Sequence, residues 1–130
     1  MLARRTGVPA LCGRYFKDGA FPDNLRAIWE SRFAYLPTWQ GGKTPVVVGE
    51  LGGWYTGKDK QWQDWAVRYM ADKGIGLFYF VLQPTSDDTG GLLKSDWESE
   101  EVEKLAMLNV LPSTSVGPLV GLAEEGGTGG

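Results

Sequence analysis

The side chains in this sequence that could do acid–base or nucleophilic chemistry are carboxylates. The chain has no histidine and a single cysteine, Cys12. The absence of histidine excludes Ser-His-Asp and Cys-His catalysis and every His-dependent metal site. One carboxylate is notable for its position, since Glu50 directly follows the apolar run Pro45–Gly49. Glu50 is therefore the first candidate for a catalytic group, although a glutamate at the end of a strand is more often solvated or ion-paired.

Glu50 is positioned by a predicted strand. The run from Pro45 to Glu50 is short, rich in β-branched residues and bounded by proline and glycine, which is typical of a strand buried on both faces in a parallel sheet. The carboxyl ends of parallel strands face the active site in α/β proteins, so we expect Glu50 at the rim of such a face. Gly49, Gly52 and Gly53 are expected to leave room for a substrate beside the backbone.

Two helices are predicted on either side of this strand. The first follows a turn and cap at residues 21–24, carries apolar side chains at helical spacing and is ended by Pro37. Residues 38–44 then form a polar connection to the strand. The second helix is capped by Asp59 and stops at Gly74.

A second strand and a third helix complete the predicted elements. The apolar, aromatic run Ile75–Leu82 predicts a strand, and the loop Gln83–Trp97 follows it. The third helix spans about Ser99–Leu108 and is closed by Pro112. The alternation of helices and strands indicates βα units and a parallel sheet.

Composition and charge limit the class of protein. The chain has 130 residues, of which 42% are hydrophobic and 22% charged, as in a globular domain. The net charge of -3 gives no electrostatic reason to expect nucleic acid or an anionic membrane as a partner. No apolar run approaches the ~20 residues of a transmembrane helix, and none has the pattern of a signal peptide.

Three segments resemble glycoside hydrolase family 5, the cellulase family A enzymes. The stretch Phe78–Trp97 is similar to the last strand and following loop of that family, where Asn-Pro-x-Ser-Gly-Asp-Thr-Gly-Gly is common. The segment Val46–Gly53 is similar to the family's Pro-Val-x-x-Gly-Glu-Phe-Gly, whose glutamate is the nucleophile. Residues 15–16 and 21–29 look like the lead-in to the preceding helix. The resemblance covers Tyr15–Leu111.

The resemblance implies an α/β fold and a glycosidase function. The chain is expected to be a C-terminal fragment of a (β/α)8 TIM barrel, with about the last two βα units and the preceding helix. It is about half the length of a complete barrel of roughly 250 residues. The resemblance implies that Glu50 is the nucleophile of a retaining double-displacement reaction in polysaccharide catabolism, on a β-glucan polysaccharide or oligosaccharide. That reaction requires no metal or organic cofactor.

Other residues of these segments are candidates for contact with a substrate. Trp54 is expected either to stack on a glucan or to cover the rim of the barrel. The family often has a tryptophan where Leu82 stands and an asparagine where Gln83 stands. Gln83 is therefore expected either to contact the substrate or only to cap the strand. Trp62 and Trp65 lie on the apolar face of the second helix, and both are predicted to be in the core.

The resemblance is incomplete, because the Asn-Glu-Pro-like motif that carries the family's acid/base glutamate is absent. We divide the chain into a non-matching, irregular start at 1–13, a partial catalytic domain at 14–112 and a flexible Gly/Ser-rich tail at 113–130. Such a fragment has open sheet edges, so it is expected to be marginally stable or to aggregate. It is expected to be inactive alone, because a lone nucleophile lacks the group that protonates the leaving group. The alternative is a non-catalytic carbohydrate-binding or structural remnant of such an enzyme. An extracellular location is expected by analogy with the family alone.

Overall fold

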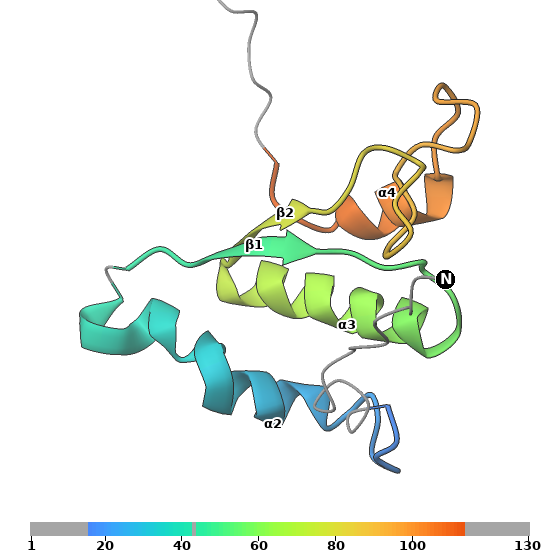
Figure 1. The fold of residues 1–130 in the computed structure, drawn as a ribbon. Helices are drawn as coiled ribbons and strands as arrows, with labels where there is room; N and C mark the ends of the chain where they lie inside the picture. Colours follow the sequence, from blue (N-terminus) through green and yellow to red (C-terminus); the bar gives the residue numbers. More distant parts are fainter. Residues whose placement is uncertain (1–15, 43, 114–130) are drawn as a thin grey trace, which may run out of the picture.

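The computed structural model describes residues 16–42 and 44–113, which form a small α/β unit (Figure 1). The elements in chain order are helix α2 (Leu25–Trp29), a π-helical turn (Glu30–Ala34), a 3₁₀-helix (Leu36–Gly41), strand β1 (Val47–Leu51), helix α3 (Gly57–Lys73), strand β2 (Gly76–Tyr79) and helix α4 (Val102–Leu108). The predicted start at 1–13 lies outside the described residues, as does the predicted tail beyond residue 113.

The two strands lie side by side and parallel, with α3 as the crossover between them (Figure 1). The residue pairs of the register are Val47 with Gly76, Val48 with Leu77, and Leu51 with Tyr79. Between the last two pairs, β1 has two residues, Gly49 and Glu50, where β2 has only Phe78. This two-against-one arrangement is a β-bulge, and it lies at the carboxyl end of β1.

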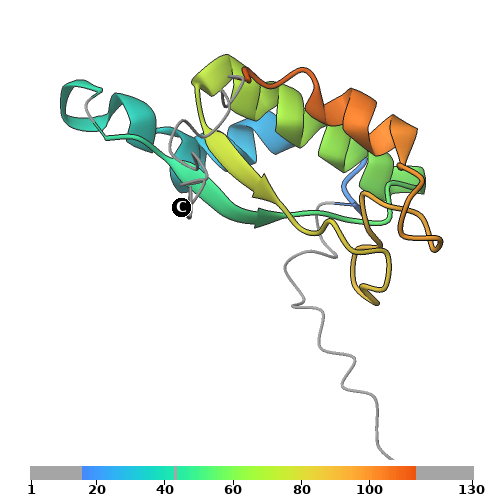
Figure 2. The same ribbon diagram turned by 90° about the horizontal axis from the view of Figure 1, so that it is seen from above.

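The helices cover one side of the sheet. Figure 2 shows α3 and α4 on the same side of the two strands, while the opposite side is left open. Val47 on β1 is 55% exposed and Phe78 on β2 is 69% exposed. The prediction that the first strand is buried on both faces is therefore wrong for the part of the chain that the structure describes.

The core forms between the helices and the covered side of the sheet. α3 contributes the largest share, because Ala66, Val67, Tyr69 and Met70 follow one another at helical spacing and are all buried. The other buried apolar residues come from α2 and the turn after it, from β1 and its loop, from the residue before β2 and from α4: Leu25, Trp29, Ala34, Leu51, Tyr55, Ile75 and Met107. The ion pair between Lys73 and Glu30, with atoms 2.6 Å apart, joins the end of α3 to the π-helical turn.

The structure confirms the prediction that the second helix stops at Gly74 and the prediction of a parallel sheet. It differs from the predictions for residues 38–44, for Pro37 and for Trp65. Gly74 ends α3 in the left-handed conformation, with φ of 65°. The region predicted as a polar connection is largely a 3₁₀-helix. Pro37 lies in the first turn of this helix instead of ending the preceding one, because a proline in a first turn needs no N–H donor. Trp62 packs against the core as predicted, but Trp65 is 37% exposed, so its predicted burial is wrong.

The elements after α3 are shorter than predicted. β2 ends at Tyr79 and not at Leu82, and α4 begins at Val102 and not near Ser99. The loop between them folds back on itself, since Leu92 donates a backbone hydrogen bond to Val81 and Leu93 donates one to Leu82. Within residues 16–42 and 44–113, no helix combines the length and the apolar character needed to cross a bilayer.

Candidate active site

Glu50 lies at the bulge, where β1 ends. Val48 packs against the core, and Leu51 is only 5% exposed in the same core. Two residues three positions apart in a regular strand point to opposite faces, so the extra residue of the bulge is what allows both to enter the core. Glu50 itself stays exposed. It borders an apolar hollow of about 280 Å³ between β1, the π-helical turn and α3, whose walls include Phe33 and Trp62.

The loop after Glu50 is held against the end of β2. Phe80 donates a backbone hydrogen bond of 2.9 Å to the carbonyl oxygen of Leu51. A Cβ at Gly52 would lie 1.8 Å from the carbonyl oxygen of Phe80, so only glycine fits there. The space beside Gly53 is filled by the side chains of Asp59 and Gln63, each of which would lie 2.4 Å from a Cβ. The expectation that these glycines leave room for a substrate is therefore wrong at both positions.

A buried polar network on α3 fixes the same loop. The prediction that Asp59 is the cap residue is wrong, since Thr56 is the N-cap of α3 and Asp59 lies in its first turn. The carboxylate of Asp59 accepts a hydrogen bond of 2.8 Å from the backbone N–H of Tyr55, which has a φ of 60°. The same carboxylate accepts a 2.8 Å hydrogen bond from the side-chain amide of Gln63. Gln63 is completely buried, and its side-chain oxygen accepts a 2.8 Å hydrogen bond from the hydroxyl of Tyr79 on β2. Burial, with the Asp59 carboxylate nearby, raises the pKa of Tyr79 to about 12.

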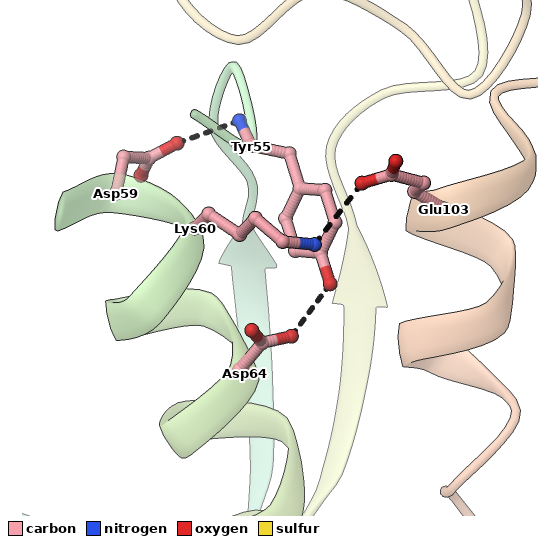
Figure 3. Close-up of polar contacts among 5 residues, drawn as sticks. All are labelled: Tyr55, Asp59, Lys60, Asp64 and Glu103. Atoms are coloured by element: carbon pink, nitrogen blue, oxygen red, sulfur yellow. Dashed lines mark hydrogen bonds and ion pairs between the residues drawn. The ribbon is translucent and has the colours of Figure 1, made fainter. Parts of the chain in front are cut away.

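A second polar group joins the loop to α3 and α4 (Figure 3). The hydroxyl of Tyr55 donates a hydrogen bond of 2.5 Å to Asp64, and burial together with this carboxylate raises the pKa of Tyr55. The ammonium of Lys60 lies 3.7 Å from the centroid of the Tyr55 ring and pairs with Glu103 at 3.1 Å. Because Glu103 is exposed and Lys60 only partly buried, this ion pair contributes little to the stability of the fold.

The two candidate contact residues lie in the loops at the same end of the sheet as Glu50. Trp54 is 56% exposed, and its ring lies against Gly90, where a Cβ would be 3.0 Å from two ring carbons. Gln83 has an exposed side chain, while its backbone carbonyl closely approaches Gly91. Parallel strands bring their carboxyl ends to one edge, which is where Glu50, Trp54 and Gln83 all lie.

Sequence reasoning missed two buried polar residues at this end of the sheet, Gln63 and Lys104. Lys104 on α4 is 5% exposed, and its ammonium donates hydrogen bonds of 3.1 Å to the carbonyl of Thr89 and 3.0 Å to that of Gly91. Burial lowers the pKa of Lys104. For Gln63 there was a signal in the sequence, because it stands four positions after Asp59 and side chains at this spacing contact each other on a helix. No local signal distinguishes Lys104 from the other charged residues of its helix.

Among the described residues, no group of three or more acidic, histidine or cysteine side chains is arranged to hold a metal ion. The groups available for chemistry at this end of the sheet are the exposed carboxylate of Glu50 at the strand end and, in the loops, the exposed indole of Trp54 and the exposed amide of Gln83.

Comparison with known proteins defines the class to which the chain belongs. No protein-family model matches the sequence. The chain nevertheless aligns over most of its length with endoglucanases, and it superposes on part of one of their catalytic domains. It therefore belongs to the cellulase-type glycoside hydrolases, of whose catalytic domain it spans a part. This confirms the resemblance at the level of a glycosidase.

Two endoglucanases are examples of the relatives that align with this chain. The chain is 41% identical over 105 residues to the major extracellular endoglucanase of Xanthomonas campestris pv. campestris, a match that covers 78% of this chain and 21% of that protein. It is 35% identical over 114 residues to an endoglucanase of Paenibacillus polymyxa, covering 85% of this chain and 27% of the relative. The chain thus spans about a quarter of the length of these relatives.

Solved structures give the same result. The catalytic domain of the Xanthomonas enzyme superposes with a TM-score of 0.67 and 40% identity, over 75% of this chain and 28% of that domain. An endocellulase from Pyrococcus horikoshii in complex with cellotetraose superposes with a TM-score of 0.62 and 37% identity, over 68% of this chain and 24% of that one.

Proposed function

We propose that this chain supplies the nucleophile of a retaining β-glucan hydrolase, with Glu50 as that nucleophile. The observation that carries the proposal is the place of Glu50. It is an exposed carboxylate at the carboxyl end of β1, inside the segment that aligns with endoglucanases. In this proposal, β1, α3, β2 and α4 are the last two βα units of a family 5 (β/α)8 barrel, and the rest of the barrel lies outside the chain.

The proposed reaction has two displacements. The carboxylate of Glu50 attacks the anomeric carbon, the bond to the leaving-group oxygen breaks, and a covalent glycosyl–enzyme forms. A second carboxyl group, about 5–5.5 Å away in retaining enzymes, protonates the leaving group and then activates the water that releases the sugar. In the proposal this second group comes from the larger part of the catalytic domain, which the chain does not span, so the chain alone is inactive.

The proposed substrate is a cellulose-like β-glucan. Trp54 and Gln83 support this, because an exposed indole and an exposed amide flank the strand end that carries Glu50 and together offer stacking and hydrogen bonding. The cellotetraose complex of the Pyrococcus endocellulase, 37% identical to this chain, is a second support.

A chimera tests the role of Glu50. The segment of the Xanthomonas catalytic domain that aligns with this chain is replaced by residues 16–113, and hydrolysis of a chromogenic cellotetraoside is measured. We expect activity that falls by about 10⁴-fold or more in Glu50→Gln, because the loss of a nucleophile removes most of the rate enhancement. Glu98→Gln, an exposed glutamate in the loop before α4, is the matched control and should retain activity.

Two further measurements separate the mechanism from its alternatives. A 2-deoxy-2-fluoro-cellobioside should label the chimera at Glu50 in peptide mass spectrometry, and NMR should show the β-anomer as the first product. Labelling at another carboxylate would contradict the role of Glu50. A well-folded chimera that binds cellotetraose without hydrolysing it would favour the alternative, a non-catalytic carbohydrate-binding remnant, for which the exposed Trp54 is the supporting feature.

A further inference from the structure

A small hollow lies between α2 and α3, and we call it the arginine hollow. Its volume is about 210 Å³. Its walls come from one residue of α2 and four of α3: Arg26, Trp65, Arg68, Tyr69 and Asp72. The four residues of α3 stand at positions i, i+3, i+4 and i+7, so their side chains share one stripe of the helix. None of the five borders the apolar hollow beside Glu50, so the arginine hollow is a separate surface.

Two aromatic side chains give the arginine hollow its apolar surface. Tyr69 is 4% exposed, and its ring packs against that of Trp29 on α2, with the ring centroids 5.2 Å apart. Trp65, one turn earlier on the same stripe, is 37% exposed. The tyrosine ring is therefore fixed by the core, whereas the indole has an open part on which a flat apolar group can stack.

The two arginines of the arginine hollow are available for an anion. The guanidinium of Arg26 lies 5.8 Å from the centroid of the Tyr69 ring, which is close enough for a cation–π contact. Arg26 and Arg68 are both exposed, and neither takes part in the two ion pairs found among residues 16–42 and 44–113. A guanidinium presents its N–H donors in a planar fork that matches the two oxygens of a carboxylate.

The charge and the size of the arginine hollow favour a sugar acid as ligand. Two arginines and Asp72 give its lining one net positive charge, on a chain whose net charge is -3. Its volume lies below the range of about 300–1,000 Å³ of most small-molecule sites, so it suits a single ring. Asp72 repels a bare anion but can accept a hydrogen bond from a hydroxyl group. A sugar acid combines a carboxylate, hydroxyl groups and an apolar C–H face, whereas an acidic peptide side chain has only the first.

We propose that the arginine hollow binds a uronate, the carboxylate-bearing sugar of acidic polysaccharides. Arg26 and Arg68 bind the carboxylate. Trp65 lies against the C–H face of the ring, and Asp72 accepts a hydrogen bond from a hydroxyl group. This site goes beyond the proposed function, because its ligand is an acidic sugar and its residues are neither Glu50 nor the candidate contact residues near it. It holds the protein on an acidic polysaccharide without taking part in bond cleavage.

An NMR titration of the isotope-labelled full chain with methyl β-D-glucuronide tests the proposal. We expect saturable shifts of the indole N–H signal of Trp65, and binding about tenfold tighter than that of methyl β-D-glucoside, which lacks the carboxylate. Arg68→Gln should weaken glucuronide binding about tenfold, and Arg26→Gln, on the other helix, should do the same. Arg32→Gln is the matched control, since Arg32 is an exposed arginine of the π-helical turn outside the hollow. A dispersed spectrum shows that each variant is folded.

Two other arms separate a sugar acid from other anions and from the proposed nucleophile. Trp65→Ala should weaken binding of the glucuronide severalfold, because the stacking surface is lost, and should leave the weaker binding of N-acetylglutamate unchanged. Glu50→Gln should bind the glucuronide as the unmodified chain does, so the result does not depend on the role of Glu50. The proposal is overturned by the absence of saturable shifts in the folded chain, by equal binding of glucuronide and glucoside, or by equal effects of Arg68→Gln and Arg32→Gln. N-acetylglutamate that binds as tightly as the glucuronide would also overturn it, in favour of an acidic peptide.

Discussion

The hydroxyl of Tyr79 on β2 donates a 2.8 Å hydrogen bond to the side-chain oxygen of Gln63 on α3. Gln63 is completely buried, and its amide donates in turn to Asp59, which holds the backbone of Tyr55. One side chain therefore connects the second strand to the loop that follows Glu50. In a sheet of only two described strands, this contact fixes the loop of the candidate nucleophile relative to β2.

Gln63→Leu is expected to destabilise the chain. The change keeps a side chain of similar size but removes both side-chain hydrogen bonds of Gln63. The partly buried Tyr79 hydroxyl then loses its acceptor, and Asp59 Oδ2 keeps only the hydrogen bond from the backbone N–H of Tyr55. The free energy of unfolding in urea should fall by about 1–3 kcal/mol. Gln61→Leu makes the same substitution at an exposed position two residues earlier on α3, and it should change stability by less than about 0.5 kcal/mol. Equal effects would mean that the network does not stabilise the fold.

The raised pKa of Tyr79 also predicts that the stability of the fold decreases at alkaline pH. Its pKa is raised to about 12 in the folded chain, from about 10 in an unfolded one. A group with a raised folded pKa stabilises the fold fully below its unfolded pKa and loses that contribution as the pH rises through the folded value. The stability of the unmodified chain should therefore fall between about pH 10 and pH 12.

Tyr79→Phe isolates this contribution, because the other titrating groups are shared by both proteins. At pH 8 the variant should be less stable by about 1 kcal/mol, since the hydrogen bond to Gln63 is lost. The difference should narrow as the pH rises from about 10 to 12, because Tyr79 ionises more readily in the unfolded chain. Urea unfolding of both proteins at pH 8, 10 and 11.5 measures this difference in unfolding free energy. A difference that stays constant over this pH range would contradict the prediction.

The sequence predicts the order and type of the elements because their signals are local. The run before Glu50 has the β-branched residues and bounding proline of a strand, and Gly74 has the conformational freedom that a helix end requires. The parallel pairing follows from the alternation of helices and strands. These features need no knowledge of distant contacts, and the structure confirms them.

The features that the sequence does not predict depend on distant contacts. The bulge at Gly49 and Glu50 exists only relative to Phe78 of the other strand. The burial of Lys104 depends on the carbonyls of a loop more than ten residues away. Trp65 lies on the helix face predicted to be apolar, yet it is 37% exposed, because the described chain provides no element to cover it. Helical spacing sets which residues share a face, and the packing partners decide which of them are buried.

Gly52→Ala tests the close approach between the loop after Glu50 and the end of β2. The added Cβ would lie 1.8 Å from the carbonyl oxygen of Phe80, which is backbone and can move only with the strand. We expect a loss of about 1–3 kcal/mol or more in unfolding free energy. Gly49→Ala, three residues earlier in β1, is the control, since nothing lies within 4 Å of a Cβ there. If both variants are equally stable, the loop is free to move away from Phe80.

Lys104→Met tests whether the buried ammonium holds the loop between β2 and α4. Methionine has a similar length without the charge, so the carbonyls of Thr89 and Gly91 lose their donor while the packing of the stem is largely kept. The unfolding free energy should fall by about 1–3 kcal/mol, and the amides of residues 89–92 should exchange faster with solvent. Lys94→Met, the same change at an exposed lysine, should alter neither quantity. A more stable Lys104→Met would mean that the cost of burying the ammonium, which lowers its pKa, exceeds the stabilisation from its two hydrogen bonds.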